Sequence, residues 1–143
     1  MTFRRALIAG LVAVAVCEAA CSRPFLIRPR GSLKSAILFE FLDKPSDEKA
    51  MSVRLHEFEV QRHEGPDRWS TVWRLGGAGN VASVTYGRAT TGFQESRPPI
   101  SLIQEGQYRA FASASFAAAG GTAIVFFAFD ADGTVRVTEA VLK

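Results

Sequence analysis

The amino-acid sequence predicts an all-β protein, an antiparallel β-sandwich of about seven to eight strands. From Ser32 onward, short runs of β-branched and aromatic residues alternate with turn signals rich in Gly, Pro, Asn and Asp. No segment of this part keeps a 3.6-residue apolar repeat between helix caps. With 143 residues, 48% of them hydrophobic, the chain is long enough for one core.

The expected strands follow from the turn signals between them. They cover residues 33–42, 51–62, 69–75, 81–86, 100–103, 107–116, 122–129 and 134–141. The glycine-rich residues 76–80 are expected to form a loop, and residues 87–99 an irregular segment.

The apolar residues of the second expected strand change phase. Val53 and Leu55 share one face, and Phe58 and Val60 have the opposite parity. A β-bulge at or just after His56 produces such a switch.

Two features of the last third predict how its strands lie. Residues 123–127 are apolar at every position, which favours a central strand covered on both faces. Asp132-Gly133 separates two such runs and predicts a hairpin turn with positive φ at both residues.

The first twenty residues are typical of an export signal. A short positive head, residues 1–5, precedes the apolar run of residues 6–16. Eleven helical residues rise about 16 Å, roughly half of a hydrocarbon core of about 30 Å. We therefore expect residues 1–20 to be a signal peptide, residues 21–31 a tether containing Pro24 and Pro29, and residues 32–143 the domain.

Both cysteines of the chain border this signal. Ala19 and Ala20 precede Cys21, an arrangement that resembles the lipobox of bacterial lipoproteins, in which small residues precede the cysteine that receives diacylglycerol. The resemblance implies a membrane lipid anchor at Cys21. Because Ser22 is not the aspartate that retains such proteins in the inner membrane, it also implies the outer membrane, facing the periplasm.

Two other processing routes stay open. Glu18 stands where the lipobox has an aliphatic residue, whereas Cys17 has Val14 and Ala15 at matching positions but the bulky Val16 beside the cut. Cleavage at the A-x-A pattern of residues 13–15 would instead give a soluble periplasmic or secreted protein.

One segment carries a resemblance to a fold family. Leu102, Gly106 and Tyr108 resemble the residues that lead into strand F of fibronectin type III and related immunoglobulin-like sandwiches, and transthyretin-like sandwiches have a similar step. The resemblance implies a sandwich of one of these kinds. It also implies that the Tyr108 hydroxyl bonds backward to the main chain, as in a tyrosine corner.

The sequence offers no recognisable chemical site. A net charge of +3 with scattered basic residues is no footprint for nucleic acid. Four candidates are a metal site at His56 and His63, a calcium loop at residues 130–133, a nucleophile at Ser113 or Ser115, and paired carboxylates at Glu57 and Glu59. We favour a surface role for the histidines and the glutamates, a turn for residues 130–133 and a packing role for the serines. We therefore expect no catalytic residue, metal or cofactor.

These observations favour a non-catalytic, lipid-anchored module that binds a protein of an envelope assembly. Trp69 and Trp73 share one face of their expected strand, together with Leu75, and core packing is the simplest role for them. If that face were exposed, the pair would form a binding surface, and the alternative function is a small-ligand or carbohydrate binder that uses both tryptophans.

Lipid attachment is tested by metabolic labelling of cells with a fatty-acid analogue. We expect Cys21→Ala to abolish the label, because diacylglycerol is attached through the cysteine thiol, and Cys17→Ala to leave it unchanged. Label that follows Cys17, or no label on the wild-type chain, would contradict anchoring at Cys21.

Overall fold

A computed structural model describes residues 24–116 and 119–139, and this part of the chain contains nine β-strands and no helix. The all-β prediction is confirmed. The strands are β1 (Leu26–Gly31), β2 (Ile37–Leu42), β3 (Val53–Gly65), β4 (Arg68–Val81), β5 (Ser83–Thr85), β6 (Phe93–Arg97), β7 (Tyr108–Phe116), β8 (Ala119–Phe129) and β9 (Val135–Thr138). Cys17 and Cys21 lie outside the described residues, so lipid attachment stays a prediction.

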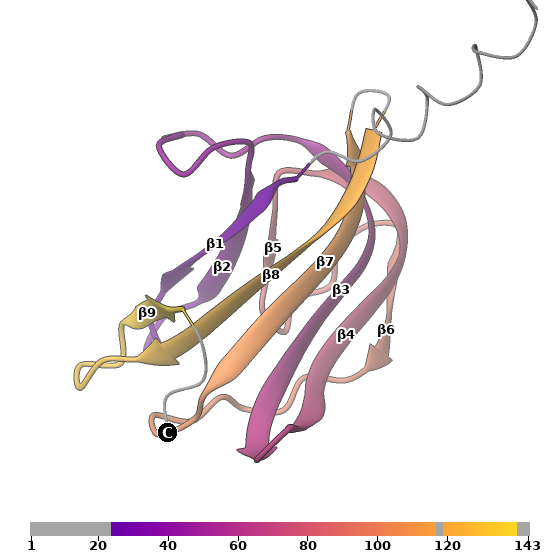
Figure 1. The fold of residues 1–143 in the computed structure, drawn as a ribbon. Helices are drawn as coiled ribbons and strands as arrows, with labels where there is room; N and C mark the ends of the chain where they lie inside the picture. Colours follow the sequence, from indigo (N-terminus) through magenta and orange to yellow (C-terminus); the bar gives the residue numbers. More distant parts are fainter. Residues whose placement is uncertain (1–23, 117–118, 140–143) are drawn as a thin grey trace, which may run out of the picture.

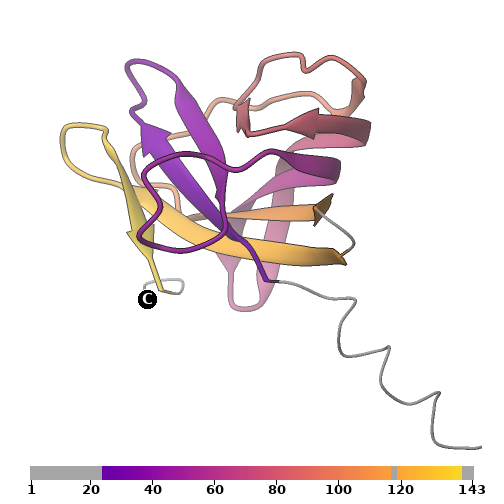
Figure 2. The ribbon, with the colours of Figure 1, turned by 90° about the horizontal axis from the view of Figure 1, so that it is seen from above.

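The strands form two antiparallel sheets that pack into a sandwich. The larger sheet has the order β6-β4-β3-β7-β8-β9 and the smaller one the order β1-β2-β5. Figures 1 and 2 show the smaller sheet against one face of the larger sheet. On the β9 side the sheets are joined by a bridge between Ser32 and Thr134 and by a 2.9 Å hydrogen bond from Leu33 N–H to the Gly133 carbonyl.

The core depends on size complementarity between the two sheets. The inward positions of β7 include Ala110, Ala112 and Ala114, all buried. The Phe39 ring of β2 lies 5.0 Å from Phe58 on β3 and 5.5 Å from Phe127 on β8, the two strands that flank β7. Phe39 therefore lies above the alanines of β7, whose small side chains leave room for the ring.

The bulge expected in β3 is confirmed. The pairing of β3 with β7 steps from Leu55–Ala114 to Glu57–Ser113, so His56 is the additional residue against β7. The pairing of β3 with β4 shifts register at the same place. Leu55 before the bulge and Phe58 after it are both fully buried. One inserted residue thus keeps both apolar pairs of β3 on the core face.

A second bulge, in β4, separates the two tryptophans. Thr71 pairs with Gln61 and Trp73 pairs with Val60, which leaves Val72 unmatched. The interpretation that Trp69 and Trp73 share one face is therefore wrong. Trp73 is 0% exposed in the core, whereas Trp69 is half-buried on the opposite face of the sheet.

The domain begins earlier than the sequence predicts. Residues 26–31, expected to be part of a tether, form β1 and pair with β2. Phe25 and Ile27 are buried in the core. The folded part therefore includes Phe25, rather than starting near Ser32, because alternating apolar residues outweigh the effect of the nearby prolines and arginines.

The glycine-rich residues 76–80 are strand rather than loop. They belong to β4 and pair with β3 on one side, while Gly76 and Gly77 also pair with β6 on the other. A Cβ atom on Gly79 would lie 2.9 Å from Cε2 of Phe93, so glycine allows this ring to approach. Two further predictions are wrong. Residues 87–99, expected to be irregular, contain β6, and residues 100–103, expected to be a strand, are not one.

The turn at Asp132-Gly133 has a different geometry from the one predicted. Gly133 N–H donates to the Asp130 carbonyl at 2.8 Å and Gly133 has φ of 86°, whereas Asp132 has no positive φ. This is a type I turn followed by a glycine bulge. The Asp132 carboxylate accepts the Thr134 N–H at 2.9 Å, and this bond lowers the pKa of Asp132.

Two tyrosines hold the segment that precedes β7. The Tyr108 hydroxyl accepts a hydrogen bond from Ile103 N–H at 2.9 Å, so the backward bond expected of this residue is present. The Tyr86 hydroxyl donates to the Ile100 carbonyl at 2.6 Å. Burial raises the pKa of both phenols above the ordinary value of about 10.

The alanine face of β7 is tested by overpacking. We expect Ala112→Leu to lower the free energy of unfolding by about 1–3 kcal/mol, because the added side chain meets the buried aromatic layer. Ser113→Leu, the neighbouring position on the opposite face, is the matched control and should change it by less than about 0.5 kcal/mol. Urea unfolding measures both, and equal losses would contradict the role given to the alanines.

Burial of Tyr86 is tested by measuring how the free energy of unfolding changes at alkaline pH. Because its pKa is raised in the folded state, the unfolded chain loses the phenol proton first, and stability falls as pH rises above about 10. In Tyr86→Phe the loss of stability with rising pH should be smaller. Part of the loss should remain, because the pKa of Tyr108 is also raised. Denaturant unfolding between pH 8 and 11 measures the slope, and parallel wild-type and variant curves would refute the assignment.

Candidate functional site

The outer face of the six-stranded sheet carries uncovered apolar side chains. Phe111 pairs with Ile124, and Arg109 pairs with Phe126, across β7 and β8. Ile124 is 55% exposed, so the prediction that this strand is covered on both faces is wrong. We call four large apolar residues of this face the outer apolar strip: Trp69, Phe111, Ile124 and Phe126.

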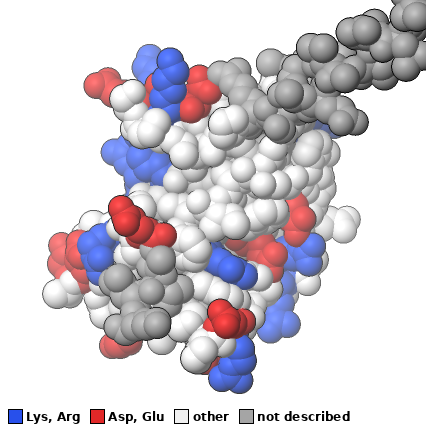
Figure 3. Space-filling view, in the orientation of Figure 1, with Lys and Arg blue, Asp and Glu red and all other residues white. Residues whose placement is uncertain are grey.

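Few charged side chains lie over β7 and β8 on this face of the molecule. Figure 3, in the orientation of Figure 1, shows a broad uncharged area over β7 and β8, with charged side chains of both signs around it. Apolar residues grouped on adjacent strands, with polar residues around them, are typical of a contact surface.

Arg109 is fixed at one end of this strip. Its guanidinium carbon lies 4.2 Å from the centre of the Trp69 ring, and its Nε donates to Gln61 Oε1 at 2.6 Å. Gln61 in turn donates to Glu59 at 3.0 Å, and the Thr71 hydroxyl donates to the same carboxylate oxygen. Among the described residues, the two terminal amino groups of Arg109 make no hydrogen bond, so they can receive an acceptor from outside.

The two tryptophans do not form a joint surface. Trp73 is buried, and its indole N–H donates to Glu95 at 3.2 Å. The Trp69 ring contacts Arg109, Phe126 at 5.9 Å and His63 at 5.2 Å. Only Trp69 of the pair thus contributes to the outer face, and its ring already has three neighbours.

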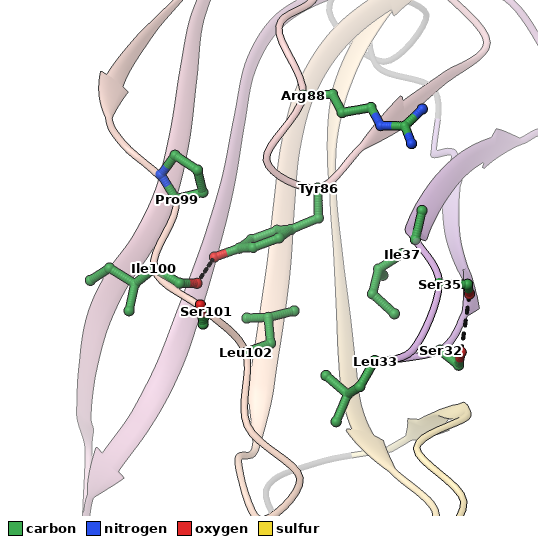
Figure 4. A pocket seen from close by; sticks show the side chains of 11 residues that line it. Ser32, Leu33, Ser35, Ile37, Tyr86, Arg88, Pro99, Ile100, Ser101 and Leu102 are labelled. Carbon is green, nitrogen blue, oxygen red and sulfur yellow. Dashed lines mark hydrogen bonds between the residues drawn. The ribbon is translucent and has the colours of Figure 1, made fainter.

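A cavity of about 380 Å³ opens at a different place, between the start of β2, the residues after β5 and residues 99–102. Figure 4 shows the Tyr86 ring facing Leu102 on one side, with Leu33 and Ile37 on the other and Arg88 at the rim. Sequence reasoning missed this cavity because three distant segments build it, and none of them carries a ligand-binding motif.

The candidate chemical groups stay apart. No group of three side chains able to hold a metal ion comes together in residues 24–116 and 119–139. His56 is exposed on β3, and its Nε2 atom lies 3.2 Å from the Ser115 hydroxyl. His63 lies near the other end of the same strand. Asp130 pairs with Arg136 at 2.9 Å beside the turn.

In the described part no helix is long and apolar enough to cross a membrane.

Comparison of the chain with protein-family models, with curated proteins and with solved structures gave no significant match. The assignment of function therefore rests on the residues and geometry described above.

Proposed function

We propose that this protein is a non-catalytic protein-binding module of the bacterial envelope, held by a lipid on Cys21 at the outer membrane and facing the periplasm. The observation that carries the binding role is the exposed Ile124 within the outer apolar strip, beside the fixed guanidinium of Arg109.

The composition of this surface supports a protein partner. Trp, Phe and Arg are enriched at the centres of protein interfaces, and such residues account for most of the binding free energy. The strip lies on the paired strands β4, β7 and β8, so its side chains are ordered before a partner arrives. Little conformational entropy is then lost on binding.

The chemistry of Arg109 defines the partner further. Its terminal amino groups can form charge-assisted hydrogen bonds with a carboxylate, and the stacked Trp69 ring keeps the guanidinium plane in place. The proposed partner therefore presents apolar side chains to Ile124 and Phe126, and an Asp or Glu side chain to Arg109.

The lipid anchor would hold the domain close to the membrane. Phe25 is buried in the core and follows Cys21 by four residues in the sequence. Four fully extended residues span at most about 14 Å, so the end of the sandwich that begins β1 would lie near the bilayer. The partner is accordingly proposed to be a membrane-associated envelope protein.

Binding of carbohydrate through both tryptophans has less support. Trp73 is buried, and Arg109 covers part of the Trp69 ring on which a sugar would stack. A relation to immunoglobulin-like or transthyretin-like sandwiches is likewise a proposal, supported by the backward hydrogen bond of Tyr108.

The binding role is tested by photocrosslinking in cells. Benzoylphenylalanine at position 124, in place of Ile124, should give one discrete adduct with another protein, because this side chain is the most exposed of the outer apolar strip. The same crosslinker in place of the exposed Gln94 on β6 should not give it. Adding Arg109→Gln should reduce the adduct about tenfold or more, because the variant loses the charge-assisted hydrogen bonds to the partner.

Thermal unfolding of the Arg109→Gln chain checks that the sandwich is intact. No adduct at position 124, an equal adduct at position 94, or an adduct unaffected by Arg109→Gln would contradict the proposal. An adduct of two copies of this chain would also contradict it, because the occupant would then be a second copy.

A further inference from the structure

We propose that the cavity beside Tyr86 binds a small amphiphilic carboxylate, such as a medium-chain fatty acid, with its apolar body inside and its carboxylate at Arg88. This inference is independent of the proposed protein-binding role, because the cavity shares no residue with the outer apolar strip.

One wall of the cavity is fixed by hydrogen bonds. The Tyr86 hydroxyl donates to the Ile100 carbonyl at 2.6 Å, and Ile100 N–H donates to the Val72 carbonyl at 2.9 Å. Ile103 N–H is held in turn by the Tyr108 hydroxyl. These bonds attach residues 100–103 to the sandwich at three points, so the cavity exists without a ligand.

One part of this open cavity suits an apolar group. The Tyr86 ring and Leu102 face Leu33 and Ile37 across it, as Figure 4 shows, and Ile37 is buried. The volume of about 380 Å³ falls near the lower limit of the range for small-molecule sites, about 300–1,000 Å³. A ligand smaller than a typical drug molecule therefore fits best.

The rim of the cavity favours a negative charge. Among the described residues, the Arg88 guanidinium makes no hydrogen bond or ion pair, and no Asp or Glu lines the cavity. The hydroxyls of Ser32 and Ser35 lie 3.0 Å apart and share one hydrogen bond, so one of the two protons is free to be donated. A ligand carboxylate at this rim can accept charge-assisted hydrogen bonds from Arg88. It is not repelled by another carboxylate, because no Asp or Glu lines the cavity.

The ligand class is tested by titrating the isotope-labelled full chain with octanoate below its micelle-forming concentration, with amide chemical shifts as the readout. We expect saturable shifts at Ile37, Tyr86 and Leu102. 1-Octanol, which has the same chain length without the charge, should bind about tenfold or more weakly, as should octanoate to Arg88→Gln. Arg54→Gln, an exposed arginine remote from the cavity in sequence and absent from its lining, is the matched control and should bind octanoate like wild type.

A second variant tests the position of the apolar body. Ser101 is exposed and lines the cavity, so Ser101→Trp should obstruct it and abolish octanoate binding without a change in thermal unfolding. Shifts that do not saturate, shifts confined to Ile124 and its neighbours, or equal affinity for octanoate and octanol would overturn the proposal. Unchanged binding in Arg88→Gln would overturn it as well.

Discussion

The position of the Phe39 ring above the small alanines of β7 is the constraint on which the rest of the sandwich depends. Because Ala110 and Ala112 are small, Phe39 reaches the rings of Phe58 and Phe127 on either side of β7. A larger residue in the middle of β7 would separate the sheets. Close packing at this point holds β2 against the inner face of the larger sheet.

Two inserted residues decide which side chains reach the outer face of the larger sheet. His56 restores the apolar phase of β3, and Val72 changes the phase of β4 between Thr71 and Trp73. A shift of one residue moves every following side chain to the other face of a strand. The bulge in β4 therefore buries Trp73 and leaves Trp69 outside, where Arg109 stacks on it.

The two proposed binding surfaces lie in different kinds of structure. The outer apolar strip lies on regularly paired strands, whereas the cavity is bounded largely by irregular segments that hydrogen bonds attach to the sandwich. A sheet face suits a broad protein contact, and a concave site of limited volume suits a small molecule. One domain can thus carry both roles without competition for the same residues.

Patterns within single segments determined the all-β class, the bulge at His56, the place of the turn at Gly133 and the backward bond of Tyr108, because each follows from neighbours a few residues apart. The tertiary structure decided what distant contacts control. The glycines of β4 pair with β3 and β6, the smaller sheet recruits Phe25 and Ile27, and only one face of β8 meets a partner sheet. A sequence shows which residues are apolar, but burial depends on which surface comes to lie against them.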